Sequence, residues 1–449
     1  MKKNRLISTL LTVLLLTTAI IPFSTFAAEP PEVTAQHALL MDAHYDEVLY
    51  DKGAYEKTSP ASITKVMTAI LVLEAVERGE LSMDQMVTVS SGVIENLDPE
   101  ASNVGLEPGE QMSVKDLLYC TLLVSACEAC DVLAEAVAGT VDAFVVRMNN
   151  RAEQLGMKDT HYANTSGLHH PDHYTTAWDL YILAKHALAN DAFMTIANTI
   201  AYDVPATNLS DSRELHTTNS LISNWRILGY LYDGAEGLKT GTTDEAGACL
   251  LSSAVRGERR IVCVVLGCDG EGNTSQTFPD SIKLYDYGFD NFSTKTILTS
   301  DEMIDEMSVK LSKQTSYVVV HPAENLEAVL PNDLSPDELT RTVTFNAEYA
   351  LAPIAKGDVL GEISLSYGGH VYGSAPLLAQ YDVEASKFLT AKYHLEQFLS
   401  RTVVQLSILG ILILIALFVL WWKLLRPKRR YGRSAKGRRT RNYHGRRRR

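Results

Sequence analysis

The most informative stretch of this 449-residue sequence runs from Ser59 to Thr68 and reads SPASITKVMT. Apolar residues recur from here at helical spacing as far as Val76, so the stretch opens a helix. Ser62 and Lys65 lie three residues apart and therefore share one side of its first turn. A lysine kept neutral by burial and a neighbouring positive charge can take the proton of a serine hydroxyl. The pair is a candidate nucleophile and base, although the pattern alone also fits a capped helix start with an exposed lysine.

A second polar motif is Lys239-Thr240-Gly241, which stands just before a β-rich run. On a strand, the lysine and the threonine can bind a carboxylate, and the glycine lets a substrate backbone lie close. Taken alone, the motif also fits a simple turn.

The surrounding pattern predicts helices packed against an antiparallel sheet. A β-hairpin is expected over residues 36–55, and a second hairpin joins 246–255 to 260–267. Helices are expected at 62–77, after the cap at Ser113, at 140–155, at 176–189 and at 276–292. From 294 to 383, short β-type runs broken by Pro and Gly predict a small all-β domain, and 384–400 reads as a helix or stalk.

In this order, the motifs resemble the S-x-x-K, S-x-N, K-T-G signature of penicillin-binding proteins and class A β-lactamases. The sequence is most similar to the low-molecular-mass D-alanyl-D-alanine carboxypeptidases. The resemblance rests on SPASITKVMT at 59–68, LLVSA at 122–126, DGAEGLKTGTT at 233–243 and AGACL at 246–250. Residues 351–357, LAPIAKG, with Gly361, are similar to the β domain that follows the catalytic domain in this family. The similarity extends over about residues 35–390.

The resemblance implies an α/β (α+β) penicillin-binding or β-lactamase-like transpeptidase domain, then a small β-sandwich and one C-terminal transmembrane helix. It implies that the enzyme removes the terminal D-Ala from peptidoglycan stem pentapeptides through an acyl-enzyme and that β-lactams inhibit it. The resemblance implies that Ser62 is the nucleophile, Lys65 the base and Ser125 a proton relay. It implies that Lys239, Thr240 and Gly241 form the slot for the substrate carboxylate, with Arg260 as a further carboxylate ligand. The oxyanion hole would consist of the backbone N–H groups of Ser62 and Thr242.

One position departs from the family pattern. Two residues after Ser125 the family has Asn, and this chain has Cys127. An amide both donates and accepts hydrogen bonds, whereas a thiol does either only weakly. We expect the loss to cost about 1–3 kcal/mol, or one to two decades in rate.

Two alternatives to a working peptidase remain, and the departure at Cys127 supports only the first of them. One is a penicillin-fold protein that binds stem peptides with little or no turnover, and the other is a β-lactamase. The first alternative is supported if the natural protein does not turn over a D-Ala-D-Ala peptide and the Cys127→Asn variant does. Rapid hydrolysis of a cephalosporin would support the second.

The two ends of the chain read as membrane-targeting segments. Residues 1–27 have a basic start, an apolar core and small residues before a cleavage point, as in a secretory signal peptide. Residues 402–422 are uncharged and long enough to span a membrane, and Trp421 and Trp422 suit its interface. The positive-inside rule places the basic tail, 423–449, in the cytoplasm and the catalytic domain (28–293), the β domain (294–383) and the stalk (384–401) outside. Membrane lipid is therefore an expected partner of the span and the tail.

Charge is divided sharply along the chain. Fourteen of the 41 Lys and Arg residues lie in 423–449 and three lie in the first five residues. Residues 28–401 therefore carry 24 basic and all 54 acidic residues, a net charge of −30. An acidic body of this kind is not the profile of a nucleic-acid-binding domain.

The six cysteines read mainly as buried core thiols. Cys120, Cys127 and Cys130 have the spacing of one helix face, with a single disulfide or a weak C-x-x-C redox site as alternatives. His169, His170 and His173 read as a surface loop. No metal or cofactor is expected, because a zinc site needs a second paired cysteine cluster, which is absent, and the sequence has no H-E-x-x-H, Walker or G-x-G-x-x-G motif. The G-x-S-x-G nucleophile elbow is absent as well.

Overall fold

The structure is a computed structural model that describes residues 29–99, 101–270 and 275–425. The predicted signal peptide and most of the basic tail lie outside the described residues. The helices are η1 (Ala61–Thr64), α2 (Lys65–Glu77), α3 (Ser91–Glu95), α4 (Val114–Leu123), α5 (Cys127–Ala138), α6 (Val141–Leu155), α7 (Ala177–Leu188), α8 (Asp191–Ala197), α9 (Thr277–Asn291), η3 (Pro336–Glu338), α10 (Lys387–Ser400) and α11 (Thr402–Leu425). The strands are β1 (His37–Asp42), β2 (Glu47–Lys52), β3 (Met86–Thr88), β4 (Gln111–Ser113), β5 (Ala201–Val204), β6 (Arg213–His216), β7 (Ala235–Thr243), β8 (Gly247–Arg256), β9 (Arg259–Cys268), β10 (Phe292–Leu298), β11 (Asp305–Lys310), β12 (Tyr317–Pro322), β13 (Leu326–Pro331), β14 (Thr340–Phe345), β15 (Ala350–Leu351), β16 (Val359–Tyr367) and β17 (His370–Ala379).

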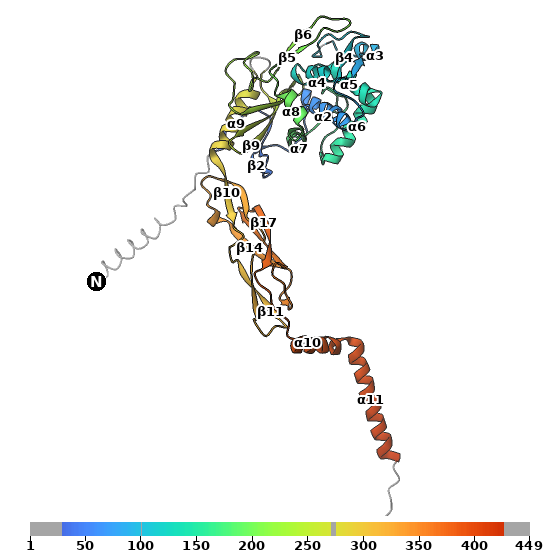
Figure 1. The fold of residues 1–449 in the computed structure, drawn as a ribbon, viewed down its shortest axis with the longest axis vertical. Helices are drawn as coiled ribbons and strands as arrows, with labels where there is room; N and C mark the ends of the chain where they lie inside the picture. The colour runs from blue at the N-terminus through green and yellow to red at the C-terminus, as the bar shows by residue number, and fades with distance from the viewer. Residues whose placement is uncertain (1–28, 100, 271–274, 426–449) are drawn as a thin grey trace, which may run out of the picture. The chain divides into compact units, whose positions relative to one another are not determined.

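A five-stranded antiparallel sheet of order β2-β1-β9-β8-β7 organises the first part of the chain. Both faces of its central strand β9 are buried. Alternate residues Val262, Val264 and Leu266 pack into the core with α2 and α4–α8, while their neighbours Ile261, Cys263 and Val265 pack with α9. Figure 1 shows α9 on one side of the sheet and the group of helices around α2 on the other. The predicted fold, helices on an antiparallel sheet, is confirmed.

The helix caps that the sequence predicts are present. The side chains of Ser113, Thr140 and Thr176 accept hydrogen bonds from backbone N–H groups in the first turns of α4, α6 and α7. Gly156, in the left-handed conformation, ends α6. The three N-caps each satisfy a backbone N–H group, and Gly156 fixes the end of α6. Apolar periodicity alone does not define these helix ends.

The prediction that three cysteines share one helix is wrong. Helix α4 ends at Leu123 and α5 begins at Cys127, so Cys120 belongs to one helix and Cys127 and Cys130 to the next. The break falls at Ser125, whose φ of 66° is left-handed and interrupts the helical path. All six cysteines are free and buried, as core thiols should be.

The chain forms two compact units. Of the described residues, the first contains those up to Thr299 together with 325–341 and 364–374, and the second contains the others. Up to α10 the C-terminal region consists of strands and the short helix η3, with a two-stranded β10–β13 ribbon and a six-stranded sheet of order β14-β16-β17-β12-β11-β15. Its core in the second unit includes Val309, Val318 and Ile354.

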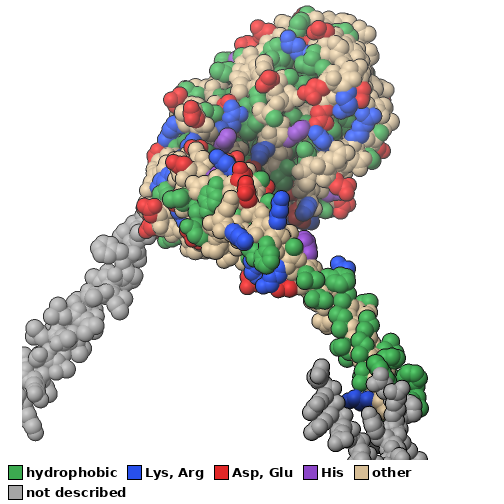
Figure 2. Space-filling model, turned by 60° about the horizontal axis from the view of Figure 1, so that its bottom comes forward, with side chains coloured by type: hydrophobic (Ala, Val, Ile, Leu, Met, Phe, Trp, Pro, Cys, Tyr) green, Lys and Arg blue, Asp and Glu red, His purple; other side chains and the backbone are tan. Residues whose placement is uncertain are grey.

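Helix α11 is the candidate membrane span among the described residues. It is 24 residues long, has a mean hydropathy of 3.0, and buries none of its side chains within the protein. Figure 2 shows its surface covered with hydrophobic side chains. Exposed apolar surface on this scale needs a covering, and a lipid bilayer provides one.

Candidate active site

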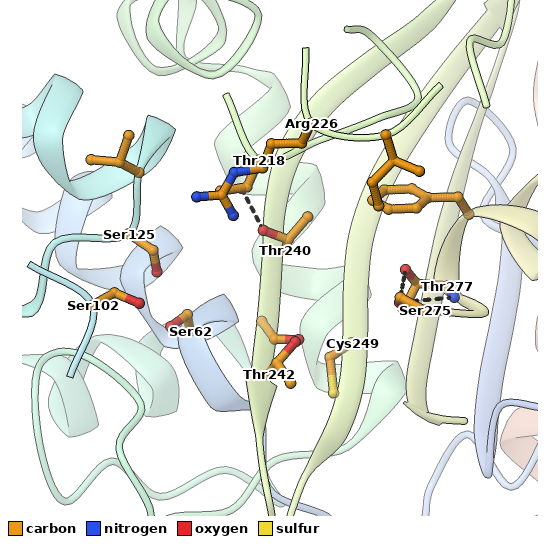
Figure 3. Close-up of a pocket in the computed structure, with 14 residues that line it drawn as sticks. Ser62, Ser102, Ser125, Thr218, Arg226, Thr240, Thr242, Cys249, Ser275 and Thr277 are labelled. Atoms are coloured by element: carbon orange, nitrogen blue, oxygen red, sulfur yellow. Dashed lines mark hydrogen bonds between the residues drawn. The ribbon is translucent and has the colours of Figure 1, made fainter. Parts of the chain in front are cut away.

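A cavity of about 460 Å³ opens where edge strand β7 passes the start of α2. Its lining includes Ser62, Ser125, Thr240 and Thr242 (Figure 3). Because β7 is the last strand of its sheet, one side of its backbone is free to pair with an extended peptide. The sequence motifs therefore meet in a cavity with a peptide-binding edge.

Ser62 and Lys65 form the contact that the sequence predicts. Ser62 lies in η1, and Lys65, fully buried, is the first residue of α2. The Lys65 Nζ lies 2.9 Å from the Ser62 Oγ, 2.7 Å from the Ser166 carbonyl oxygen and 3.4 Å from the Cys127 Sγ. These three neighbours hold the amine in one place against the serine hydroxyl.

A second buried lysine adds charge to this region. Lys239 is 2% exposed, and its Nζ donates to the Thr240 carbonyl oxygen at 2.9 Å. Burial and, second, the charge of Lys65 lower the pKa of Lys239 to about 7. The site therefore disfavours the charged form of Lys239 next to Lys65.

Ser125 and Cys127 complete the inner wall. The Ser125 Oγ is buried and has no hydrogen-bond partner within the described part of the chain. Figure 3 shows its hydroxyl facing the same space as Ser62. Its left-handed backbone, like that of Ala61 beside the nucleophile, costs about 1 kcal/mol or more in a non-glycine residue. Such strain is typical of residues held for function.

Two glycines allow the backbone to approach the nucleophile closely. A Cβ on Gly241 would lie 2.9 Å from the Ser62 nitrogen, so the glycine lets β7 run against η1. A Cβ on Gly167, whose φ is 86°, would lie 1.8 Å from the Ala61 carbonyl oxygen. Gly167 therefore packs directly against the Ala61 backbone, next to Ser62.

We expect Gly167→Ala to destabilise the protein by about 3 kcal/mol or more, because it combines a left-handed residue with a backbone collision. Gly156→Ala is the matched control: its φ of 87° is nearly that of Gly167, but no atom lies within 4 Å of the added Cβ. The control should lose only about 1 kcal/mol. Denaturant unfolding of both full-length variants in detergent measures the difference. Equal losses would contradict the close approach beneath Ser62.

His173 contacts the same short helix, η1, that carries Ser62. It is buried, its Nε2 lies 2.9 Å from the Thr64 Oγ1, and its Nδ1 accepts from the Ala163 N–H. Burial lowers the pKa of His173 to about 4, so the ring is neutral at physiological pH. The prediction of a surface loop holds for His169 and His170 and is wrong for His173. In the described residues, no group of three His, Cys, Asp or Glu side chains is arranged to hold a metal ion.

The structure does not bring Arg260 to the cavity. Arg260 pairs with Val255 of β8, whereas Thr242 pairs with Ala248, seven residues along the same strand. At 3.3 Å per residue this separates Arg260 from the site by roughly 20 Å. Its guanidinium instead donates to Glu236 at 3.2 Å.

Arg226 is the arginine that lines the cavity, and the sequence analysis did not single it out. It lies in the 217–234 segment between β6 and β7, and its side chain is exposed. Figure 3 shows its guanidinium directed toward the space between Ser125 and Thr240. Thr218 lies beside it and its hydroxyl is 2.6 Å from that of Thr240. The segment has neither a motif nor a periodicity that would have marked either residue.

Two family models match this chain. The model described as D-alanyl-D-alanine carboxypeptidase matches residues 24–270, and that of the penicillin-binding protein 5 C-terminal domain matches 292–385. The D-alanyl-D-alanine carboxypeptidase DacF of Bacillus subtilis is 32% identical over 408 residues, which cover 89% of this chain and 98% of DacF.

Solved structures agree with these matches. Penicillin-binding protein 5 of Haemophilus influenzae has a TM-score of 0.63 and 28% identity, covering 80% of this chain and 99% of its own. Penicillin-binding protein D2 of Listeria monocytogenes, in a cefotaxime-bound form, has a TM-score of 0.50 and 30% identity, covering 58% and 99%. Neither a non-catalytic binding protein nor a β-lactamase is favoured by these likenesses.

Proposed function

This chain belongs to the D-alanyl-D-alanine carboxypeptidase family, and we propose that it removes the terminal D-Ala from peptidoglycan stem peptides through an acyl-enzyme on Ser62. The proposal rests above all on the 2.9 Å contact between the Lys65 Nζ and the Ser62 Oγ beside a free sheet edge. It is tested by release of D-alanine from an N-acylated tripeptide ending in D-Ala-D-Ala.

In the acylation step, the Ser62 Oγ attacks the carbonyl carbon of the terminal peptide bond and its proton passes to the neutral amine of Lys65. The backbone N–H groups of Ser62 and Thr242 are the proposed donors to the oxyanion, each worth about 3–4 kcal/mol. The carbon–nitrogen bond then breaks, and the departing D-alanine amine takes a proton through the Ser125 hydroxyl. Water cleaves the resulting ester and restores Ser62.

The charge pattern orients the peptide along β7. Thr240 and Arg226 line the cavity and provide a donor and a positive charge for the terminal carboxylate of the substrate, and the buried Lys239 lies next to Thr240. An arginine without a protein partner in the described residues is available for a bidentate contact with that carboxylate. We therefore assign to Arg226 the role that the sequence suggested for Arg260.

We expect Arg226→Ala to lower kcat/KM for the D-Ala-D-Ala peptide by about 10- to 100-fold, the value of a hydrogen bond to a charged group. The control Arg260→Ala should stay within about threefold, because Arg260 pairs with Glu236 instead. Amidation of the peptide's C-terminus should abolish the difference between wild type and Arg226→Ala. If Arg260→Ala causes the larger loss, the assignment is wrong.

β-Lactams are the expected inhibitors, because their strained amide mimics the D-Ala-D-Ala bond and acylates the same serine. The likeness to a relative with cefotaxime bound supports this expectation. In a penicilloyl ester on Ser62, the amine released by ring opening stays attached to the acyl group. It therefore cannot leave the site, and we expect the ester to persist.

We also propose a single-pass membrane protein with a signal peptide (1–27), an external catalytic domain (28–293), a β domain (294–383), a stalk (384–401), a span (402–422) and a cytoplasmic basic tail (423–449). Helix α11 and the positive-inside rule support this topology. Near an anionic surface each basic tail residue contributes about 1 kcal/mol of attraction.

Protease added to intact cells is expected to remove the catalytic domain and to leave an epitope fused after Arg449 undigested. Membrane permeabilisation should expose the epitope. Digestion of the epitope in intact cells would reverse the proposed orientation.

A further inference from the structure

Cys127 and Cys130 form a C-x-x-C pair in the first turn of α5. The helix begins at Cys127, directly after Ala126. Residues three apart in a helix have Cα atoms about 5 Å apart, and disulfides span 4.4–6.8 Å between Cα atoms. The Cys130 Sγ lies against the Ala126 carbonyl oxygen at 3.2 Å. The helix spacing therefore places the two Cα atoms, though not yet the two sulfurs, at a separation that a disulfide can span.

Both thiols are buried, but only Cys127 lines a cavity. Its cavity of about 380 Å³ shares Ser62 and Thr242 with the active-site cavity, whereas Cys130 is fully buried. The Cys127 Sγ also lies 3.4 Å from the Lys65 Nζ. The Cys127 sulfur thus lies at a helix N-terminus, beside a lysine and within a C-x-x-C pattern, which is the setting of reactive cysteines. Burial raises the pKa of Cys130, so this thiol stays protonated while Cys127 reacts first.

We propose that Cys127 and Cys130 are a dithiol site for disulfides of low-molecular-mass thiols, and that its oxidation switches off the peptidase. The inference rests on the proposed function, because Lys65 serves both the peptidase and the thiol site. It also draws on the exported location, where disulfides form and persist.

The reaction balances as two thiol–disulfide exchanges. The Cys127 thiolate attacks one sulfur of the external disulfide, the S–S bond breaks, and one thiol leaves with a proton. The Cys130 sulfur then attacks the Cys127 sulfur, releases the second thiol with its proton, and forms the Cys127–Cys130 disulfide. Two electrons pass from the protein dithiol to the external disulfide.

The expected effect on catalysis follows from the geometry. Neighbouring Cβ atoms at this spacing are about 5–6 Å apart in a helix, and a disulfide needs about 3.8 Å. Closing the bond therefore draws the first turn of α5 together and moves the Cys127 Sγ away from Lys65. An amine that loses a positioning contact is no longer held against Ser62. We expect the oxidised protein to lose on the order of a hundredfold in activity.

The test uses the full chain in detergent and oxidised glutathione as the probe. A protease that cleaves after glutamate cuts between Cys127 and Cys130 at Glu128. In the denatured, thiol-blocked protein, the two fragments stay together only when a disulfide joins them. Mass spectrometry thus detects the bond without any activity measurement, so failure of the thiol site and failure of the proposed function are distinguishable.

Two cysteine variants make the result specific. Cys120→Ala removes the other cysteine of the upstream fragment and should leave the linkage intact. Cys130→Ala should abolish the linkage and instead keep glutathione bound at Cys127, with unchanged activity before oxidation.

We expect linked fragments in the oxidised wild type, loss of activity toward the D-Ala-D-Ala peptide, slower acylation by penicillin, and recovery of both after dithiothreitol. Two results would overturn the proposal: unlinked fragments after oxidation, or linked fragments in a protein with unchanged acylation and turnover.

Discussion

Ser62→Ala is expected to reduce release of D-alanine from a D-Ala-D-Ala peptide on the order of a millionfold, as loss of a catalytic serine does elsewhere. The variant lacks the oxygen that accepts the acyl group, and the remaining cavity retains only binding and oxyanion donors. The Ser62 side chain contributes one hydrogen bond, to Lys65, so the fold should be unaffected.

Chromatography of the released D-alanine measures this loss. Ser82→Ala, an exposed serine outside both cavities, is the control and should retain full activity. A Ser62→Ala protein that keeps more than about one thousandth of the wild-type rate would place the nucleophile elsewhere.

Lys65→Arg is the second change with a large expected effect. The guanidinium keeps the positive charge but cannot accept a proton at any physiological pH. If Lys65 is the base, kcat should fall by about 10²- to 10⁴-fold. If Lys65 acts only as a fixed charge beside Ser62, arginine should preserve much of the activity.

The exposed residue Lys57 offers the matched control, because Lys57→Arg changes the same groups on the surface. Single-turnover acylation by a chromogenic cephalosporin separates the chemical step from substrate binding. Acylation in Lys65→Arg at more than about one tenth of the wild-type rate would exclude the proton-transfer role.

The parts of the site that depend on local spacing could be predicted from the sequence. Ser62 and Lys65 meet because they are three residues apart at a helix start. Lys239, Thr240 and Gly241 are consecutive residues, so a single strand, β7, carries all three. Helix caps at Ser113, Thr140 and Thr176 are equally local. In each case the signal and the structure involve neighbouring residues.

Features that depend on tertiary register could not be predicted in the same way. Arg260 has a suitable side chain, but the antiparallel pairing of β8 and β9 carries it to the far end of β7. Arg226 reaches the cavity from an irregular segment without any pattern. The break between α4 and α5 depends on a left-handed serine, a conformation that the sequence does not reveal.

The meaning of Cys127 also changes with the structure. The sequence shows only that a thiol replaces the family's asparagine, which predicts weaker hydrogen bonding to the lysine. The structure places the sulfur 3.4 Å from Lys65 and in a cavity, so the thiol both retains a contact with the amine and is open to chemistry.

The most direct measurement is the intact mass of the full-length protein after incubation with benzylpenicillin, beside the Ser62→Ala variant. We predict one penicilloyl addition to the wild type, mapped by peptide mass spectrometry to Ser62, and none to the variant. An adduct that persists in Ser62→Ala, or no adduct on a folded wild-type protein, would contradict an activated serine at this site.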